Sequence, residues 1–177
     1  MPQSVHSAVQ PLVGLRLSIA RRAGSMRGFH FGAVSEDESG SWGEYALHLQ
    51  CPWRIDGPRG VVTGQGDLWE HPTLELPPED WSYEGGNSLQ DVRLGALLGG
   101  RDERTRSWVN LKAEALIVTR VLGQESGELT LTLSGGFTLR VFPDTSRDEA
   151  WRLLARGGDG AHYVFPDDAS KDLPPEA

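Results

Sequence analysis

The best candidate for a catalytic nucleophile in this chain is Cys51, its single cysteine, which follows His48 by three positions. Histidine activates a cysteine only when the two side chains lie within hydrogen-bonding reach. Residues three apart in an extended strand point to opposite faces of the sheet. Leu47 and Leu49 share the face of Cys51, so the sequence predicts a buried and unreactive thiol.

A second group of residues suited to chemistry belongs to a hairpin predicted over residues 42–68. We expect its polar face to carry four side chains that could line a cleft, His48, Gln50, Arg54 and Asp67. An imidazole beside a carboxylate suits acid–base work, although the same residues also suit an ordinary surface salt bridge. Arg21-Arg22, in the turn of an earlier hairpin, either cradles an anion or faces solvent.

The motifs of the common catalytic and cofactor sites are missing from the sequence. It contains no phosphate-binding G-x-x-x-x-G-K-[ST] loop, no G-x-G-x-x-G after a strand and no G-x-S-x-G elbow. It also lacks closely spaced cysteines and H-E-x-x-H, so no zinc site is predicted. We therefore predict no catalytic residue, no cofactor and no metal, and favour a binding role over an enzyme.

The segment most suggestive of binding is an acidic, aromatic loop over residues 67–84. Its candidate contact residues combine aromatic rings with carboxylates: Trp69, Glu79, Asp80, Trp81, Tyr83 and Glu84. Aromatic anchors within a charged rim are typical of protein-binding hot spots, and an acidic rim speeds association with a basic partner. The prolines and aromatic residues predict an ordered surface loop.

The distribution of charge offers a test of that hypothesis. Residues 60–92 contain seven acids and no Lys or Arg, whereas residues 1–34 contain four Arg and no acid. The two regions either pair within the fold, lie in solvent, or leave the acids free for a basic partner. The net charge of −8 argues against general nucleic-acid binding, which requires a basic surface.

The cysteine content and the absence of long apolar stretches indicate where the protein is located. A single cysteine allows no disulfide within the chain, which favours the reducing cytoplasm. No stretch approaches the eighteen apolar residues of a membrane span, and the first residues do not resemble a signal peptide. We expect a cytoplasmic protein with no membrane association.

The elements that position these residues are mostly strands. Apolar and polar residues alternate over 15–19, 26–34, 45–51, 61–68, 129–133 and 137–141, with a final short strand over 161–165. Gly135-Gly136 predicts a tight hairpin turn.

Two helices are predicted from capping boxes. Ser88 with Asp91 begins one near 88–98, and Ser146 with Glu149 begins another near 147–155, with Trp151 and Leu154 on one face. We thus predict a single α+β domain over 12–166, built from antiparallel hairpins and two short helices. Residues 1–11 and 167–177 should be flexible tails.

Three segments resemble a family of uncharacterised small bacterial proteins. They are the opening hairpin with Arg21-Arg22-Ala23, the central stretch 43–54, and the closing stretch 135–153 with its Gly-Gly-Phe and Phe-Pro-Asp sequences. The closing stretch is also similar to the ends of immunity-like accessory proteins from bacterial gene clusters. The resemblance implies no catalytic residue. The absence of catalytic motifs, the acidic balance and the aromatic acidic loop favour a non-catalytic, immunity-like protein that binds a basic partner. A small-ligand-binding or enzymatic domain and a structural subunit are the alternatives.

Overall fold

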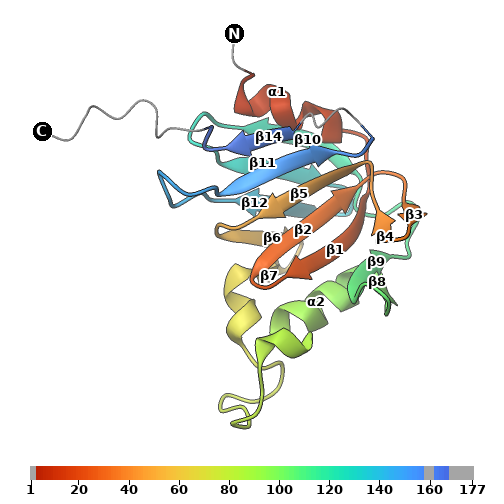
Figure 1. Cartoon of the computed structure of the whole chain (residues 1–177), viewed down its shortest axis with the longest axis vertical. Coiled ribbons are helices and arrows are strands. Elements are labelled where there is room, and N and C mark those ends of the chain that lie inside the picture. Colours follow the sequence, from red (N-terminus) through yellow and green to blue (C-terminus); the bar gives the residue numbers. More distant parts are fainter. Residues whose placement is uncertain (1–2, 158–161, 168–177) are drawn as a thin grey trace, which may run out of the picture.

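Two antiparallel β-sheets make up most of the structure, which a computed structural model describes for residues 3–157 and 162–167 (Figure 1). The larger sheet has the order β14 (His162–Phe165), β13 (Trp151–Ala155), β5 (Tyr45–Leu49), β2 (Met26–Phe31), β1 (Leu17–Ala23), β9 (Ser107–Asn110), β8 (Gly99–Asp102). The smaller has the order β10 (Val118–Gly123), β11 (Leu129–Leu133), β12 (Phe137–Val141), β6 (Trp53–Gly57), β7 (Gly60–Gly64). A separate hairpin joins β3 (Ser35–Asp37) to β4 (Gly40–Trp42). The predicted strand-dominated antiparallel architecture is confirmed.

The hairpin of β11 and β12 forms as the alternation predicts. Leu131 lies opposite Leu139 in the ladder, and the buried leucines of β11 alternate with half-buried threonines. Gly135 and Gly136 adopt φ angles of 82° and 83°, which favour glycine and suit a tight turn between twisted strands. The opening hairpin of β1 and β2 is likewise confirmed.

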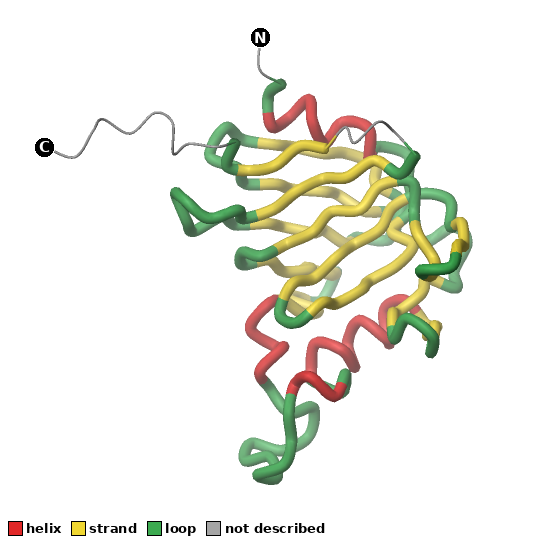
Figure 2. The backbone as a smooth tube through the Cα atoms, viewed as in Figure 1, coloured by secondary structure: helices red, strands yellow, loops and turns green. Residues whose placement is uncertain are grey.

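The two sheets pack face to face around one hydrophobic core (Figure 2). Phe29 on β2 meets Trp53 on β6 edge-on, with ring centroids 5.0 Å apart. Leucines of both sheets, Leu47 and Leu131 among them, are fully buried beside this pair. Each such side chain contributes about 1.5–3 kcal/mol on burial, so the contact between the sheets is the main source of stability.

The hairpin predicted over 42–68 is confirmed only in part: β6 pairs with β7, but the strand expected over 42–55 is divided between the two sheets. β5 ends at Leu49 in the larger sheet, and β6 begins at Trp53 in the smaller one. Cys51 and Pro52 lie where the chain crosses between the sheets, and proline breaks the strand there because it has no N–H to donate. β6 also pairs with β12, and the strand expected over 61–68 ends at Gly64, where the 3₁₀ helix η2 (Gln65–Trp69) follows.

The helix predicted near 147–155 is also wrong, because β13 is a strand. The hydroxyl of Thr145 accepts the backbone N–H of Arg147 and Asp148, so the polar residues form a turn. Trp151 is fully buried, stacks on Phe165 of β14 and donates its Nε1–H to the carbonyl of Gly127 at 2.9 Å. Packing of this tryptophan between strands outweighs the local helical pattern.

The amino-terminal segment was predicted as a flexible tail, but most of it is ordered. Ser4 caps the helix α1 (Val5–Val9), which continues into the 3₁₀ helix η1 (Gln10–Leu12). Val5 and Val9 are buried against the core, and α1 lies on β10. Gly123 permits this approach, because a Cβ there would come within 2.8 Å of the backbone nitrogen of His6. Of the predicted carboxyl-terminal tail, residues 168–177 lie outside the described residues.

The helix predicted near 88–98 is confirmed as α2 (Leu89–Leu98). The hydroxyl of Ser88 accepts the backbone N–H of Asp91, and the Asp91 carboxylate accepts the backbone N–H of Ser88, as a capping box requires. Leu94 and Leu98 are buried, and α2 packs against β7 of the smaller sheet and β9 of the larger one. The helix therefore closes the sandwich at this edge (Figure 1).

A buried polar network fastens α2 to the rest of the fold. The guanidinium of Arg27, 2% exposed, donates to Gln90 Oε1 at 2.9 Å and to Asp91 Oδ1 at 3.2 Å. Gln90 in turn donates its amide to the carbonyl of Gly64 at 2.9 Å. Three elements, β2, α2 and the end of β7, are thus joined through buried hydrogen bonds, and those of Arg27 are charge-assisted.

Candidate binding surface

The candidate contact residues lie on the loop between β7 and α2, which projects beyond both sheets (Figure 2). The segment begins in η2, and after an irregular stretch it forms the 3₁₀ helix η3 (Tyr83–Gly85) before α2. Neither sheet covers the outer part of this segment, because α2 and η2 lie between it and the strands (Figure 1). Its side chains are therefore presented on a protrusion.

Two aromatic contacts hold the ends of the protruding loop together. Trp69 meets Tyr83 edge-on with centroids 4.8 Å apart, and His71 meets Trp81 in the same manner at 5.4 Å. The ring nitrogen Nδ1 of His71 also accepts the backbone N–H groups of Thr73 and Leu74 at 3.2 and 3.1 Å. The prediction of an ordered loop packed by its own aromatic residues agrees with these contacts.

Two residues of this loop were missed by the sequence reasoning. Leu76 is 90% exposed, and Leu74 and Trp69 are about half exposed. Leucines in a segment broken by prolines, outside any strand pattern, are a sequence signal that could have identified them. With Trp69 they are the large apolar side chains that this loop exposes among the described residues.

Six of the seven acids of residues 60–92 divide into two groups, and the seventh, Asp67, is half-buried and accepts the hydroxyl of Thr63. Asp91 is buried and forms ion pairs with Arg27 and, at 3.9 Å, with Arg22. In the described part of the chain, no ion pair joins a basic side chain to the exposed acids of the loop, which are Glu70, Glu75, Glu79, Asp80 and Glu84. Pairing within the fold thus accounts for one of the seven acids, and five remain in solvent.

No family model, curated protein or solved structure matches this chain. The resemblance to small bacterial and immunity-like proteins therefore gains no support from these comparisons. No helix in the described residues is long and apolar enough to cross a membrane. Those residues also include no group of three or more His, Cys, Asp or Glu side chains that could hold a metal ion.

The four residues of the alternative cleft do not form one cluster. Gln50 donates to the Glu149 carboxylate, which also binds Arg152, the residue opposite His48 across the β5–β13 ladder. The other two lie in the region of the smaller sheet. Arg54 pairs with Asp56 at 3.0 Å, and Asp67 accepts the hydroxyl of Thr63 at 2.9 Å. The predicted convergence failed because the chain changes sheets at Pro52.

Cys51 is buried, as predicted. Its side chain is 1% exposed, and burial, reinforced by the negative charge of Asp144, raises the pKa of its thiol to about 12. Thiolate is the nucleophilic form, so very little of it exists at neutral pH. We therefore expect this thiol to react slowly with a labelling reagent in the folded protein.

Proposed function

We propose that this protein binds a basic protein partner through the loop of residues 67–84 and does so without catalysis. The observation that carries the proposal is the exposure of Leu76, which leaves 90% of a leucine in water at the end of a protruding loop. Leu74 and Trp69, each about half exposed, belong to the same loop. A concentration of exposed apolar side chains within one segment is typical of interaction sites.

The charge around this apolar surface defines the chemistry of the partner. Glu75, Glu79 and Asp80 are exposed and have no basic neighbour among the described ion pairs. Apolar contacts within an acidic rim favour a partner with a hydrophobic pocket bordered by Lys or Arg. The acids then increase the association rate, and the leucines supply the buried contact area.

The internal contacts of the loop reduce the cost of binding. The Trp69–Tyr83 and His71–Trp81 ring pairs fix the backbone at both ends of the exposed segment. A recognition loop that is already ordered loses less conformational entropy when it meets its partner. This supports recognition by a preformed protrusion over folding upon binding. A polar cleft for a small ligand has less support, since its four residues are dispersed.

The charge contribution is tested by replacing three acids with their amides, Glu79→Gln, Asp80→Asn and Glu84→Gln. We expect little change in the free energy of unfolding, because all three side chains are exposed. Association with the partner should slow, and the difference from the wild type should shrink as salt rises past roughly 0.15 M, where the screening length is about 8 Å. Stopped-flow or biosensor kinetics measure both effects.

A matched control removes the same charge elsewhere. Glu114, Glu125 and Asp148 are exposed acids on other loops, and their amides reduce the net negative charge by the same amount. The control variant should associate nearly as fast as the wild type. Equal slowing in both variants would show that only the overall charge matters, and an unchanged rate at low salt in the loop variant would exclude the loop as the recognition surface.

A further inference from the structure

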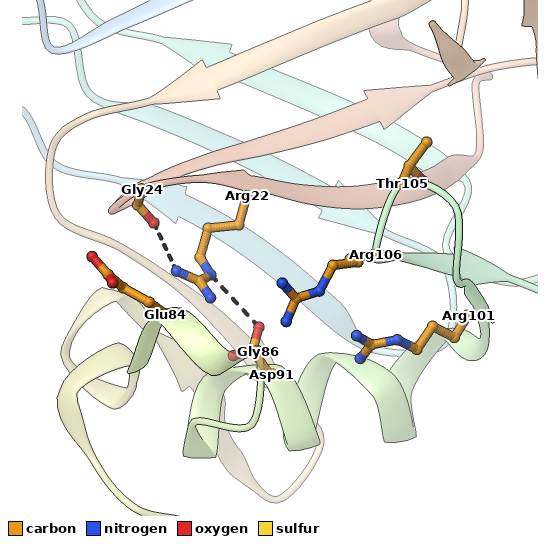
Figure 3. A pocket seen from close by; sticks show the side chains of 8 residues that line it. All are labelled: Arg22, Gly24, Glu84, Gly86, Asp91, Arg101, Thr105 and Arg106. Carbon is orange, nitrogen blue, oxygen red and sulfur yellow. Dashed lines mark hydrogen bonds and ion pairs between the residues drawn. The ribbon is translucent and has the colours of Figure 1, made fainter. Parts of the chain in front are cut away.

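Three arginines surround a cavity of about 320 Å³ at the foot of the loop, between β1, α2 and the turn from β8 to β9 (Figure 3). Arg22 comes from the end of β1, Arg101 from β8, and Arg106 from the turn that precedes β9. The three guanidinium groups extend into the same space (Figure 3). The sequence alone identifies only Arg22 as a candidate, because Arg101 and Arg106 come close to it only when the chain folds.

Two of the guanidinium groups border one spot that lacks a side chain. A Cβ at Gly86 would lie 3.2 Å from Nη2 of Arg106 and 3.7 Å from Nη2 of Arg101. Gly86 has a φ of 77°, where glycine is favoured, so this position stays open. Both guanidinium groups thus lie close to this one point, where their like charges repel, and an anion placed between them would relieve that repulsion.

The acids at the cavity do not cancel its positive charge. Asp91 is already engaged by Arg27, by Ser88 and by Arg22. Glu84 is exposed at the rim, and the Glu103 partner of Arg101 is 81% exposed, where an ion pair contributes little. The cavity therefore keeps an excess of positive charge, although the protein as a whole is acidic.

The arginines are also held in position before any ligand arrives. Arg101 stacks over Trp108 at 4.8 Å, and Arg106 donates to the carbonyl of Gly85 at 2.7 Å. Arg22 donates to the carbonyls of Gly24 and Tyr83, both at 2.8 Å. Fixed guanidinium groups lose little entropy on binding and retain N–H groups that can meet an oxyanion.

We propose that this cavity, called the arginine pocket, binds a phosphate group, either free phosphate or a small phosphate monoester. A planar guanidinium donates paired N–H bonds to phosphate oxygens, and several of them together match a divalent anion better than a monovalent one. The volume suits a small ligand. The proposal does not depend on the protein partner of the loop.

Calorimetric titration of the full chain with sodium phosphate, in a buffer free of other oxyanions, tests the proposal. Sodium chloride at matched ionic strength is the comparison, and glycerol phosphate in a parallel titration distinguishes a monoester from free phosphate. We expect saturable binding of at least one of the two, with a Kd of about 1 mM or tighter. Absence of saturation by both up to roughly 10 mM would overturn the proposal.

Two variants assign binding to the pocket. Arg106 has a φ of 54°, so Arg106→Gly removes the guanidinium at a position whose backbone suits glycine, and Arg101→Gln removes a second one. Each should raise the Kd at least about tenfold. Arg120→Gln, which changes an exposed arginine on β10, should leave the Kd unchanged. An equal loss in all three variants would contradict a specific site.

Discussion

Replacing Asp91 by alanine should lower the free energy of unfolding by about 3–5 kcal/mol, because the change leaves the guanidinium of Arg27 buried without its carboxylate. Arg27 is 2% exposed, and burial, partly offset by Asp91, lowers the pKa of its side chain to about 10. The substitution also removes the capping box at Ser88. Urea denaturation with an unchanged m-value measures the loss.

Two further variants separate the causes. Asp91→Asn keeps an oxygen that can accept the bonds from Ser88 but removes the charge, so we expect a loss smaller than that of alanine. Asp80→Ala removes an exposed acid and should change stability by no more than about 0.5 kcal/mol. If Asp91→Ala were as mild as Asp80→Ala, the buried network would not be what fastens α2.

Acidification should destabilise the protein through His30. This side chain is 1% exposed, its Nδ1 accepts the backbone N–H of Gly43, and its Nε2 has no partner among the described residues. Burial, reinforced by the positive charge of Arg21 and by His48, lowers the pKa of His30 to about 3. The unfolded chain, in which the pKa is about 6.5, therefore binds a proton that the folded chain excludes between these two values.

The direction and size of the stability change follow from the difference between the pKa values of His30 in the folded and unfolded chain. Stability from His30 is fully present above about pH 6.5 and is lost progressively as the pH falls toward 3. Between pH 7.5 and 5 the loss should be about 2 kcal/mol. His48, whose pKa burial also lowers, adds to the loss in the same direction.

Denaturation at several pH values, with His30→Gln beside the wild type, checks this expectation. Glutamine can still accept from Gly43 and does not titrate, so the stability advantage of the wild type should shrink by about 2 kcal/mol between pH 7.5 and 5. His48→Gln removes the contribution of His48 to the pH dependence, and this variant should retain most of the loss of stability between pH 7.5 and 5. A pH profile of His30→Gln parallel to that of the wild type would show that His30 is not the group responsible.

The two predicted capping boxes have different outcomes in the structure. Both have a hydroxyl residue followed three positions later by an acid, and only Ser88 begins a helix. The stretch after Ser146 is instead fixed by its neighbours, since Trp151 lies opposite Leu49 on one side and Phe165 on the other. Local spacing describes a segment by itself, whereas strand pairing with residues a hundred positions away decides its form.

The candidate site, like the fold, could be predicted from the sequence only in part. The order of the acidic loop could be predicted from its prolines and aromatic rings, but its bounds could not, because β7 ends at Gly64 and the 3₁₀ helices η2 and η3 occupy its two ends. The exposure of Leu76 and the convergence of Arg101 and Arg106 on Arg22 could not, because they depend on where α2 and the β8–β9 turn lie. Similarly, the expected cleft around His48 failed once the chain changed sheets at Pro52.

Site-specific photo-cross-linking in the native host tests the recognition loop most directly. A photoreactive amino acid at Leu76 should capture one basic protein, and capture should weaken when Glu79, Asp80 and Glu84 carry amides. The same amino acid at Leu122, an exposed residue of β10 in the smaller sheet, should not capture that protein. Equal capture from both positions, or capture from Leu76 that is indifferent to the three acids, would contradict recognition of a basic partner by this loop.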